Sequence, residues 1–216
     1  PLFYESAQPA HPLPVILITS TFSHRLSLAL KDEVYQTISH LAGTDKYDFI
    51  CILHPKLPSE TIQKWQALNG QHFQYYDTTD LVPLFHRADI MLSDTTSAIQ
   101  EFMLTGKPIV TYAHRRPNPC VIDVTEADKL EAAIDFALTR PDAQLKAIEL
   151  EAEKNHPYRD GQSSSRVIDA CISFLHRDKS YLKKKPFNII RKYKIRRLLN
   201  YYTLHSYRAP AYRPKR

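Results

Sequence analysis

Glycine is scarce in this sequence, and that scarcity excludes one common kind of nucleotide site. Only 4 of the 216 residues are glycine, whereas 15 are proline. A dinucleotide fingerprint needs several glycines in one turn, because the backbone must approach the pyrophosphate closely. No P-loop, EF-hand or zinc-ligand pattern occurs either. Any bound nucleotide must therefore be held without a glycine-rich loop, and we expect no metal and no other cofactor.

Long apolar runs and cysteines are also few. No stretch of about 18 apolar residues occurs, so no segment is predicted to cross a membrane, and no signal peptide is recognisable. The three cysteines, Cys51, Cys120 and Cys171, have no metal-binding spacing. Cys51 and Cys171 lie in apolar runs, which predicts buried free thiols in a reducing compartment.

Positive charge is concentrated at the C-terminal end of the chain. From His176 to Arg216 there are 14 lysines and arginines and one acid, a net charge of +13. The remainder has 15 basic and 22 acidic residues, a net charge of −7. We therefore expect residues 177–216 to form a basic, partly helical tail that binds an anionic membrane surface, since Tyr and Phe are interleaved with the charges. A solvated tail is one alternative; nucleic acid is another, which the acidic body disfavours.

Short apolar runs alternate with helix-type segments between residues 15 and 176. Strands are predicted at 15–19, 47–53, 72–76, 88–92, 108–112 and 120–124. Helices are predicted at 26–41, after Ser59 as N-cap, and at 79–85, 98–104, 126–138, 142–154, 163–175 and near 187–202. Strands that are apolar throughout are typical of a parallel sheet with helices on both faces. We predict an α/β, Rossmann-like domain at 15–176, preceded by a proline-rich linker at 1–14.

Polar loops that follow the strands are the candidate ligand sites, because the carboxyl ends of parallel strands share one edge of the sheet. The clearest loop is formed by Ser93, Asp94, Thr95, Thr96 and Ser97, directly before a helix. Hydroxyls and free N–H groups at a helix start predict an anion site.

On the same helix, Glu101 stands one turn beyond this loop and is placed to accept both hydroxyls of a ribose. The alternative is an ordinary capped helix with an exposed glutamate.

Three further segments follow strands. Thr19, Ser20 and Thr21 follow the first strand, and His54 ends the second, where Pro55 aims the imidazole outward. We predict that His54 stabilises or protonates a departing pyrophosphate, with a surface histidine as the alternative. A cationic cluster, His114 to Arg116, could bind phosphates or be a solvated loop.

The last helix of the body opens with Asp160, Gly161 and Ser163, whose loop has free N–H donors for a phosphate or acceptor, or is a plain N-cap. No complete nucleophile triad is present, so covalent catalysis is not predicted.

Taken together, these segments resemble the CDP-glycerol glycerophosphotransferase family, the teichoic-acid-polymerase-like enzymes. The resemblance rests on Thr19 to Phe22, on His54-Pro55, on Ala88 to Phe102 with the following Gly-Lys-Pro-Ile-Val, and on the turn from Asp160 to Arg166. It extends over residues 14–176. Thr95-Thr96 stands where many members have an aromatic residue followed by Ser, and Glu101 stands where many have Asp.

This resemblance implies the C-terminal half of a GT-B fold, with His54 as catalytic residue and the polar loops as donor site. It implies transfer of glycerol phosphate from CDP-glycerol to a lipid-linked or polymeric cell-envelope acceptor, at the cytoplasmic face of the membrane. The acceptor base would lie in an N-terminal half that this chain lacks, so we expect the chain to be inactive alone. The departures leave open a UDP-sugar GT-B glycosyltransferase or UDP-N-acetylglucosamine 2-epimerase-like domain. A non-enzymatic, basic-tailed binding module is the third hypothesis.

Overall fold

The structure is a computed structural model that describes residues 13–183, 186–199 and 201. The chain divides into unit 1, which ends at Ser164, and unit 2, which begins at Ser165. This boundary falls inside helix α7 (Ser163–His176), which the sequence placed at the end of the domain. Most of the predicted linker, and the tail after Tyr201, lie outside the described residues. Among the residues that are described, no helix is long and apolar enough to cross a membrane.

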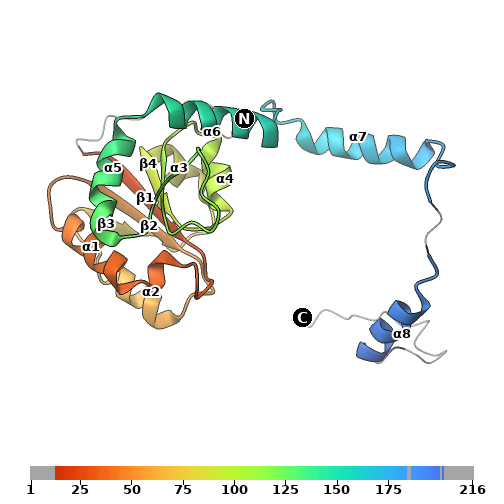
Figure 1. Ribbon diagram of the computed structural model, residues 1–216, viewed down its shortest axis with the longest axis horizontal. Coiled ribbons are helices and arrows are strands. Elements are labelled where there is room, and N and C mark those ends of the chain that lie inside the picture. Colours follow the sequence, from red (N-terminus) through yellow and green to blue (C-terminus); the bar gives the residue numbers. More distant parts are fainter. Residues whose placement is uncertain (1–12, 184–185, 200, 202–216) are drawn as a thin grey trace. The chain divides into compact units, whose positions relative to one another are not determined.

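Unit 1 is built on a six-stranded sheet with the order β3-β2-β1-β4-β5-β6 (Figure 1). The strands are β1 (Val15–Ser20), β2 (Asp48–Leu53), β3 (Phe73–Tyr75), β4 (Ile90–Ser93), β5 (Ile109–Tyr112) and β6 (Ile122–Val124). All neighbouring strands pair in parallel. The chain adds strands outward from β1 to β3 and then, in the other direction, from β4 to β6. The order therefore reverses between β1 and β4, and the predicted Rossmann-like sheet is confirmed.

Helices cover both faces of this sheet (Figure 1). Successive strand residues point to opposite faces, so Ile16 and Ile18 enter one apolar layer while Val15 and Leu17 enter the other. The first layer is completed by α1 (Asp32–Ala42), α2 (Ser59–Gln66) and α5 (Leu130–Leu138). The second layer is completed by α3 (Val82–Arg87), α4 (Ala98–Met103) and α6 (Asp142–Asn155). Burial on both sides explains why the strands are apolar throughout.

Several helix starts differ from the sequence prediction; α3 begins at Val82 rather than at 79, and α5 at Leu130 rather than at 126. The single helix expected at 26–41 is a short 3-10 helix η1 (Leu28–Leu30) followed by α1. The Leu28 N–H, at the start of η1, donates a hydrogen bond to the carboxylate of Asp94, which is distant in the sequence. The prediction of Ser59 as N-cap was wrong, because the Ile62 N–H closes the first turn on the Pro58 carbonyl, which makes Pro58 the cap.

One cysteine and the helices near the C-terminal end also differ from the sequence prediction. Cys51 and Cys120 are buried, but Cys171 is exposed on α7, so its predicted burial was wrong. Its apolar run forms one face of a helix that has no buried residue. A second 3-10 helix, η2 (Ala127–Lys129), precedes α5. The predicted basic helix is observed as the shorter α8 (Ile189–Leu198).

Candidate functional site

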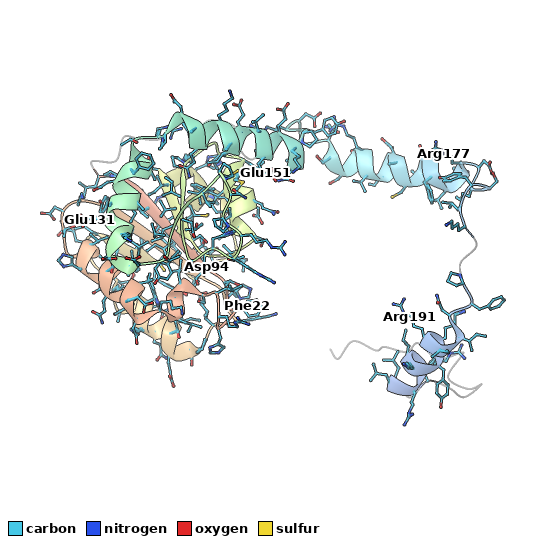
Figure 2. All side chains as sticks on the ribbon, viewed as in Figure 1. Phe22, Asp94, Glu131, Glu151, Arg177 and Arg191 are labelled. Carbon is cyan, nitrogen blue, oxygen red and sulfur yellow. The ribbon has the colours of Figure 1, made fainter. Side chains whose placement is uncertain are left out.

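The carboxyl ends of β1 and β4 are tied together by one buried carboxylate at the point where the strand order reverses. Asp94 directly follows β4 and is 0% exposed. It accepts hydrogen bonds from Ser20 Oγ at 2.7 Å, Thr21 N at 3.0 Å and Leu28 N at 3.0 Å. Burial raises the pKa of Asp94, and these hydrogen bonds oppose that rise. Figure 2 shows the side chain inside unit 1. Asp94 therefore holds the loop after β1 against the end of β4.

A set of hydroxyls packs beside this carboxylate. Thr19 Oγ1 lies 2.8 Å from Ser93 Oγ, and Ser20 Oγ lies 2.8 Å from Ser27 Oγ. Thr19 and Ser20 are each 4% exposed, and Ser93 is 0% exposed. Four of the residues predicted at the donor site therefore make hydrogen bonds within the protein. They are Thr19, Ser20, Ser93 and Asp94. They support the loops, so direct contact with a ligand would come from the exposed members of the same loops.

A surface groove of about 440 Å³ lies next to these buried residues. It is lined by the loop before α4, by α4 itself, by the loop after β5 and by α6. Its lining residues are Thr95, Thr96, Ser97, Ile99, Gln100, Met103, His114, Arg115, Arg116, Asn118, Glu151 and Asn155. The lining residues include two arginines, several residues with hydroxyl or amide groups and one glutamate, a composition that suits a phosphate-bearing ligand.

The loop after β5 brings the cationic cluster to this groove. Ala113 has a φ of 50°, a left-handed conformation that costs roughly 1 kcal/mol or more in a residue other than glycine. The Asp123 carboxylate stabilises this turn by accepting hydrogen bonds from Thr111 Oγ1 at 2.7 Å and His114 N at 2.9 Å. The Arg115 N–H donates to Thr95 Oγ1 at 2.9 Å, which links the two loops.

At the start of α4 the Thr96 Oγ1 accepts a hydrogen bond from Ala98 N at 3.5 Å, as in an ordinary capped helix. Ser97 precedes α4 but makes no capping hydrogen bond through its side chain. Ser97 and Thr96 are both among the residues that line the groove. Glu101 is exposed on the same helix, although Ile99, Gln100 and Met103 are the residues of α4 that line the groove. Its predicted ribose contact stays a prediction.

His54 lies on the other side of β1, at the end of β2. Its ring centroid is 4.5 Å from that of Phe22, which is 44% exposed (Figure 2). Its Nδ1 accepts a hydrogen bond from the Lys56 N–H at 3.1 Å. In the neutral imidazole the proton is therefore assigned to Nε2. Sequence reasoning gave Phe22 no role, although an aromatic residue in a polar loop after a strand was a usable signal.

The turn before α7 is the last predicted element of the site. Gly161 has a φ of 72°, and Asp160 Oδ1 accepts a hydrogen bond from Gln162 N at 3.1 Å. Asp160 and Gly161 are exposed, and Ser163 begins α7. None of the three is among the described residues that line the groove. Glu151 and Asn155 do line it, and no sequence signal identified them, because they reach it only through the packing of α6 on α4.

Comparisons with known proteins agree with this architecture. A sequence profile of the family UDP-N-acetylglucosamine 2-epimerase matches residues 8–172. No curated protein sequence matches the chain. Three solved structures of similar fold are a protein from Listeria monocytogenes assigned as a UDP-N-acetylglucosamine 2-epimerase, the S. aureus protein MnaA with UDP, and a variant of the wall teichoic acid polymerase TagF.

The likeness to these structures is one of fold. Sequence identity is 15%, 16% and 13%, and the TM-scores are 0.53, 0.52 and 0.52. The matches cover 81%, 81% and 76% of this chain but 50%, 48% and 44% of the other chains. The chain thus spans about half the length of these proteins. Unit 1 has the fold of one Rossmann-like half of a GT-B enzyme.

Proposed function

We propose that this chain, which belongs to the UDP-N-acetylglucosamine 2-epimerase family, is the nucleotide-binding half of a GT-B enzyme that acts on a UDP-linked sugar. The observation that carries the proposal is the groove between Thr95–Ser97 and His114–Arg116. It lies beside the reversal of strand order, the place where ligands bind in open parallel sheets. The matched residues 8–172 include both of these loops.

In this proposal the groove binds the diphosphate of the donor. The hydroxyls of Thr96 and Ser97 donate hydrogen bonds, and the guanidinium groups of Arg115 and Arg116 offset the negative charge. Glu101, exposed on α4, accepts hydrogen bonds from the ribose hydroxyls. The buried Asp94 keeps the loops in place before the donor arrives, which lowers the entropic cost of binding.

For the chemical step we propose His54. Its Nδ1 accepts a hydrogen bond from the Lys56 N–H, so the Nε2–H of the neutral imidazole donates a hydrogen bond that stabilises the negative charge of the departing diphosphate. This role requires the remainder of a GT-B enzyme, because the chain spans about half the length of its structural neighbours. We therefore expect no turnover by the chain alone.

A second candidate is a glycerophosphotransferase half that uses CDP-glycerol and a lipid-linked or cell-envelope acceptor. The order of four segments, from the Thr19–Phe22 loop to the Asp160–Arg166 turn, favours it. The same groove would bind the cytidine diphosphate. Thr95-Thr96 and Glu101 depart from the usual residues of that family, and for this reason we place the UDP-sugar first.

Nucleotide-dependent thermal stabilisation separates the candidates. A ligand at 100 times its dissociation constant adds about 2.7 kcal/mol to the free energy of unfolding. If UDP and UDP-N-acetylglucosamine raise the unfolding temperature more than CDP or CMP, the first candidate is supported. The reverse ranking supports CDP-glycerol. No shift with any of these nucleotides would contradict both and favour a non-enzymatic binding module.

Matched variants connect this response to the groove. Glu101→Ala is expected to weaken nucleotide binding roughly tenfold or more, since it removes a charged hydrogen-bond acceptor. The unfolding temperature without nucleotide should not change, because Glu101 is exposed. Glu149→Ala, on the exposed side of α6, is the control of equal charge and size. Equal affinities of the two variants would remove Glu101 from the site.

A further inference from the structure

Helix α7 exposes an apolar stripe that nothing in the described part of unit 2 buries. We define the apolar stripe as Val167, Ile168, Cys171, Ile172 and Leu175, which recur at the spacing of one helix face. Its four aliphatic side chains are between 50% and 67% exposed. The polar residues Asp169, Ser173 and His176 lie on the other side of the helix. An exposed stripe of this kind is typical of a surface that contacts a partner.

The segment that follows is strongly basic. We define the basic segment as the described residues of 177–199, which carry eight basic side chains and one acid, Asp178. The Asp178 carboxylate accepts hydrogen bonds from Ser180 N at 3.0 Å and Ser180 Oγ at 2.6 Å. The basic side chains are those of Arg177, Lys179, Lys183, Arg191, Lys192, Lys194, Arg196 and Arg197. A partner of this segment must therefore be anionic.

Exposed apolar side chains are interspersed with these charges. Phe187, Ile189 and Ile190 are each more than 70% exposed, and Leu198 is 84% exposed. At about 100° per residue, the five basic residues of α8 are distributed around the whole helix rather than along one face. Helix α8 is thus not amphipathic by itself, and the apolar stripe of α7 provides the one-sided apolar surface of unit 2.

We propose that unit 2 binds an anionic lipid surface, to which the basic segment is attracted while the apolar stripe of α7 inserts at the interface. A basic residue near an anionic bilayer strengthens attraction roughly fivefold. An amphipathic helix lies in the interface with its apolar face buried. Residues 1–175 carry a net charge of −7, which disfavours nucleic acid as the partner. The proposal is independent of the proposed function, because no residue of unit 2 lines the groove.

The test is sedimentation of the full chain with vesicles. Vesicles of phosphatidylcholine containing phosphatidylglycerol should bind the chain, and vesicles of phosphatidylcholine alone should not. Binding should weaken with salt, because the Debye length falls from about 10 Å at 0.1 M to about 3 Å at 1 M.

Charge is tested with a triple variant in α8, in which Arg191, Lys192 and Lys194 are each replaced by Gln. Binding to the anionic vesicles should weaken by on the order of 100-fold, since each of the three charges contributes roughly fivefold. A control variant removes the same charge from exposed positions of unit 1, namely Arg25, Lys146 and Lys154. It should bind within about threefold of the unchanged chain, because these charges lie outside the basic segment.

The stripe is tested with Ile168→Ser combined with Ile172→Ser, which leaves the charge unchanged. Binding should weaken at least about tenfold, because two aliphatic side chains no longer enter the interface. Leu150→Ser, an exposed leucine of α6, is the control. Circular dichroism at equal protein concentration verifies that each variant keeps its helix content.

Four outcomes would overturn the proposal. These are equal binding to neutral vesicles, an equal loss in the charge control, an unchanged affinity of the stripe variant, and tighter binding to duplex DNA than to anionic vesicles. An unchanged stripe variant would show that the stripe does not enter the lipid interface. Nucleotide stabilisation, measured on the same variants, should be retained, so a failure of lipid binding is distinguishable from a failure of the nucleotide site.

Discussion

At the scale of single residues, Asp94 shows how a costly group can be placed in a protein core. Removing a carboxylate from water is strongly unfavourable unless hydrogen bonds replace the lost hydration. Asp94 receives them from the Ser20 hydroxyl and from the Thr21 and Leu28 N–H groups. The Leu28 donor is buried and the Thr21 donor is partly buried. The residue therefore organises a loop that belongs to a different strand.

We expect Asp94→Asn to destabilise unit 1. The amide has one acceptor oxygen and brings an NH₂ group towards existing donors, so buried N–H groups lose their partners. The free energy of unfolding should fall by about 2–4 kcal/mol. Urea unfolding monitored by the fluorescence of the buried Trp65 measures the change. Asp128→Asn, at an exposed position of η2, should change stability by less than about 0.5 kcal/mol. Similar values for the two variants would contradict the structural role of Asp94.

At the scale of elements, the end of α3 depends on a residue that follows α4. Lys107 Nζ donates hydrogen bonds to the carbonyl oxygens of Phe85 at 3.1 Å, His86 at 2.8 Å and Ala88 at 2.6 Å. A cation at a helix C-terminus satisfies free carbonyls and interacts favourably with the helix dipole. Burial lowers the pKa of Lys107. In the sequence, the Gly-Lys-Pro segment was part of a donor-site pattern. In the structure, its Lys107 stabilises the end of α3.

Lys107→Met is expected to lower the free energy of unfolding by about 2–4 kcal/mol, because charged hydrogen bonds to buried carbonyls are lost. Nucleotide affinity should stay within about twofold, since Lys107 does not line the groove. Chemical denaturation and a nucleotide titration of the same variant give both quantities. Lys129→Met removes only an exposed ion pair with Glu126 and should cost less than about 1 kcal/mol. A loss of nucleotide binding with unchanged stability would assign Lys107 to the site instead.

At the scale of the whole molecule, the core lies in unit 1, whereas most of the exposed large apolar side chains of the described residues lie in unit 2. Both apolar layers consist of residues between Val15 and Ala152. By contrast, α7 and α8 contain no buried residue. No described side chain of unit 2 therefore belongs to the core of unit 1.

A chain that ends after Ser164 is expected to unfold with a free energy within about 1 kcal/mol of the full chain, since no core side chain is removed. The m-value should change little, because the area that becomes exposed on unfolding is nearly the same. Trp65 fluorescence reports on unit 1 in both chains. A large drop in stability would show that unit 2 packs on unit 1 in solution.

Much of the fold followed from local patterns along the chain. The strands bury both faces, so each is recognisable as a short apolar run, and the alternation with helices predicted the parallel sheet. The edge that carries the polar loops followed from the same topology. Helix boundaries were less accurate, as the start of α1 shows, because η1 is held by a hydrogen bond from Leu28 to the distant Asp94.

What the sequence determined by itself is therefore the class of fold, the polar loops at the carboxyl edge of the sheet and the separation of an acidic body from a basic tail. The tertiary structure alone decided which polar residues are buried supports, as for Ser20 and Asp94, and which line a groove, as for Thr95 and Arg115. It also decided that Cys171 and the apolar stripe of α7 are exposed. The physical reason is that the spacing of apolar residues along the chain shows which face of a helix or strand needs an apolar environment. Contacts between residues far apart in the chain determine whether another element provides that environment, and which element does so.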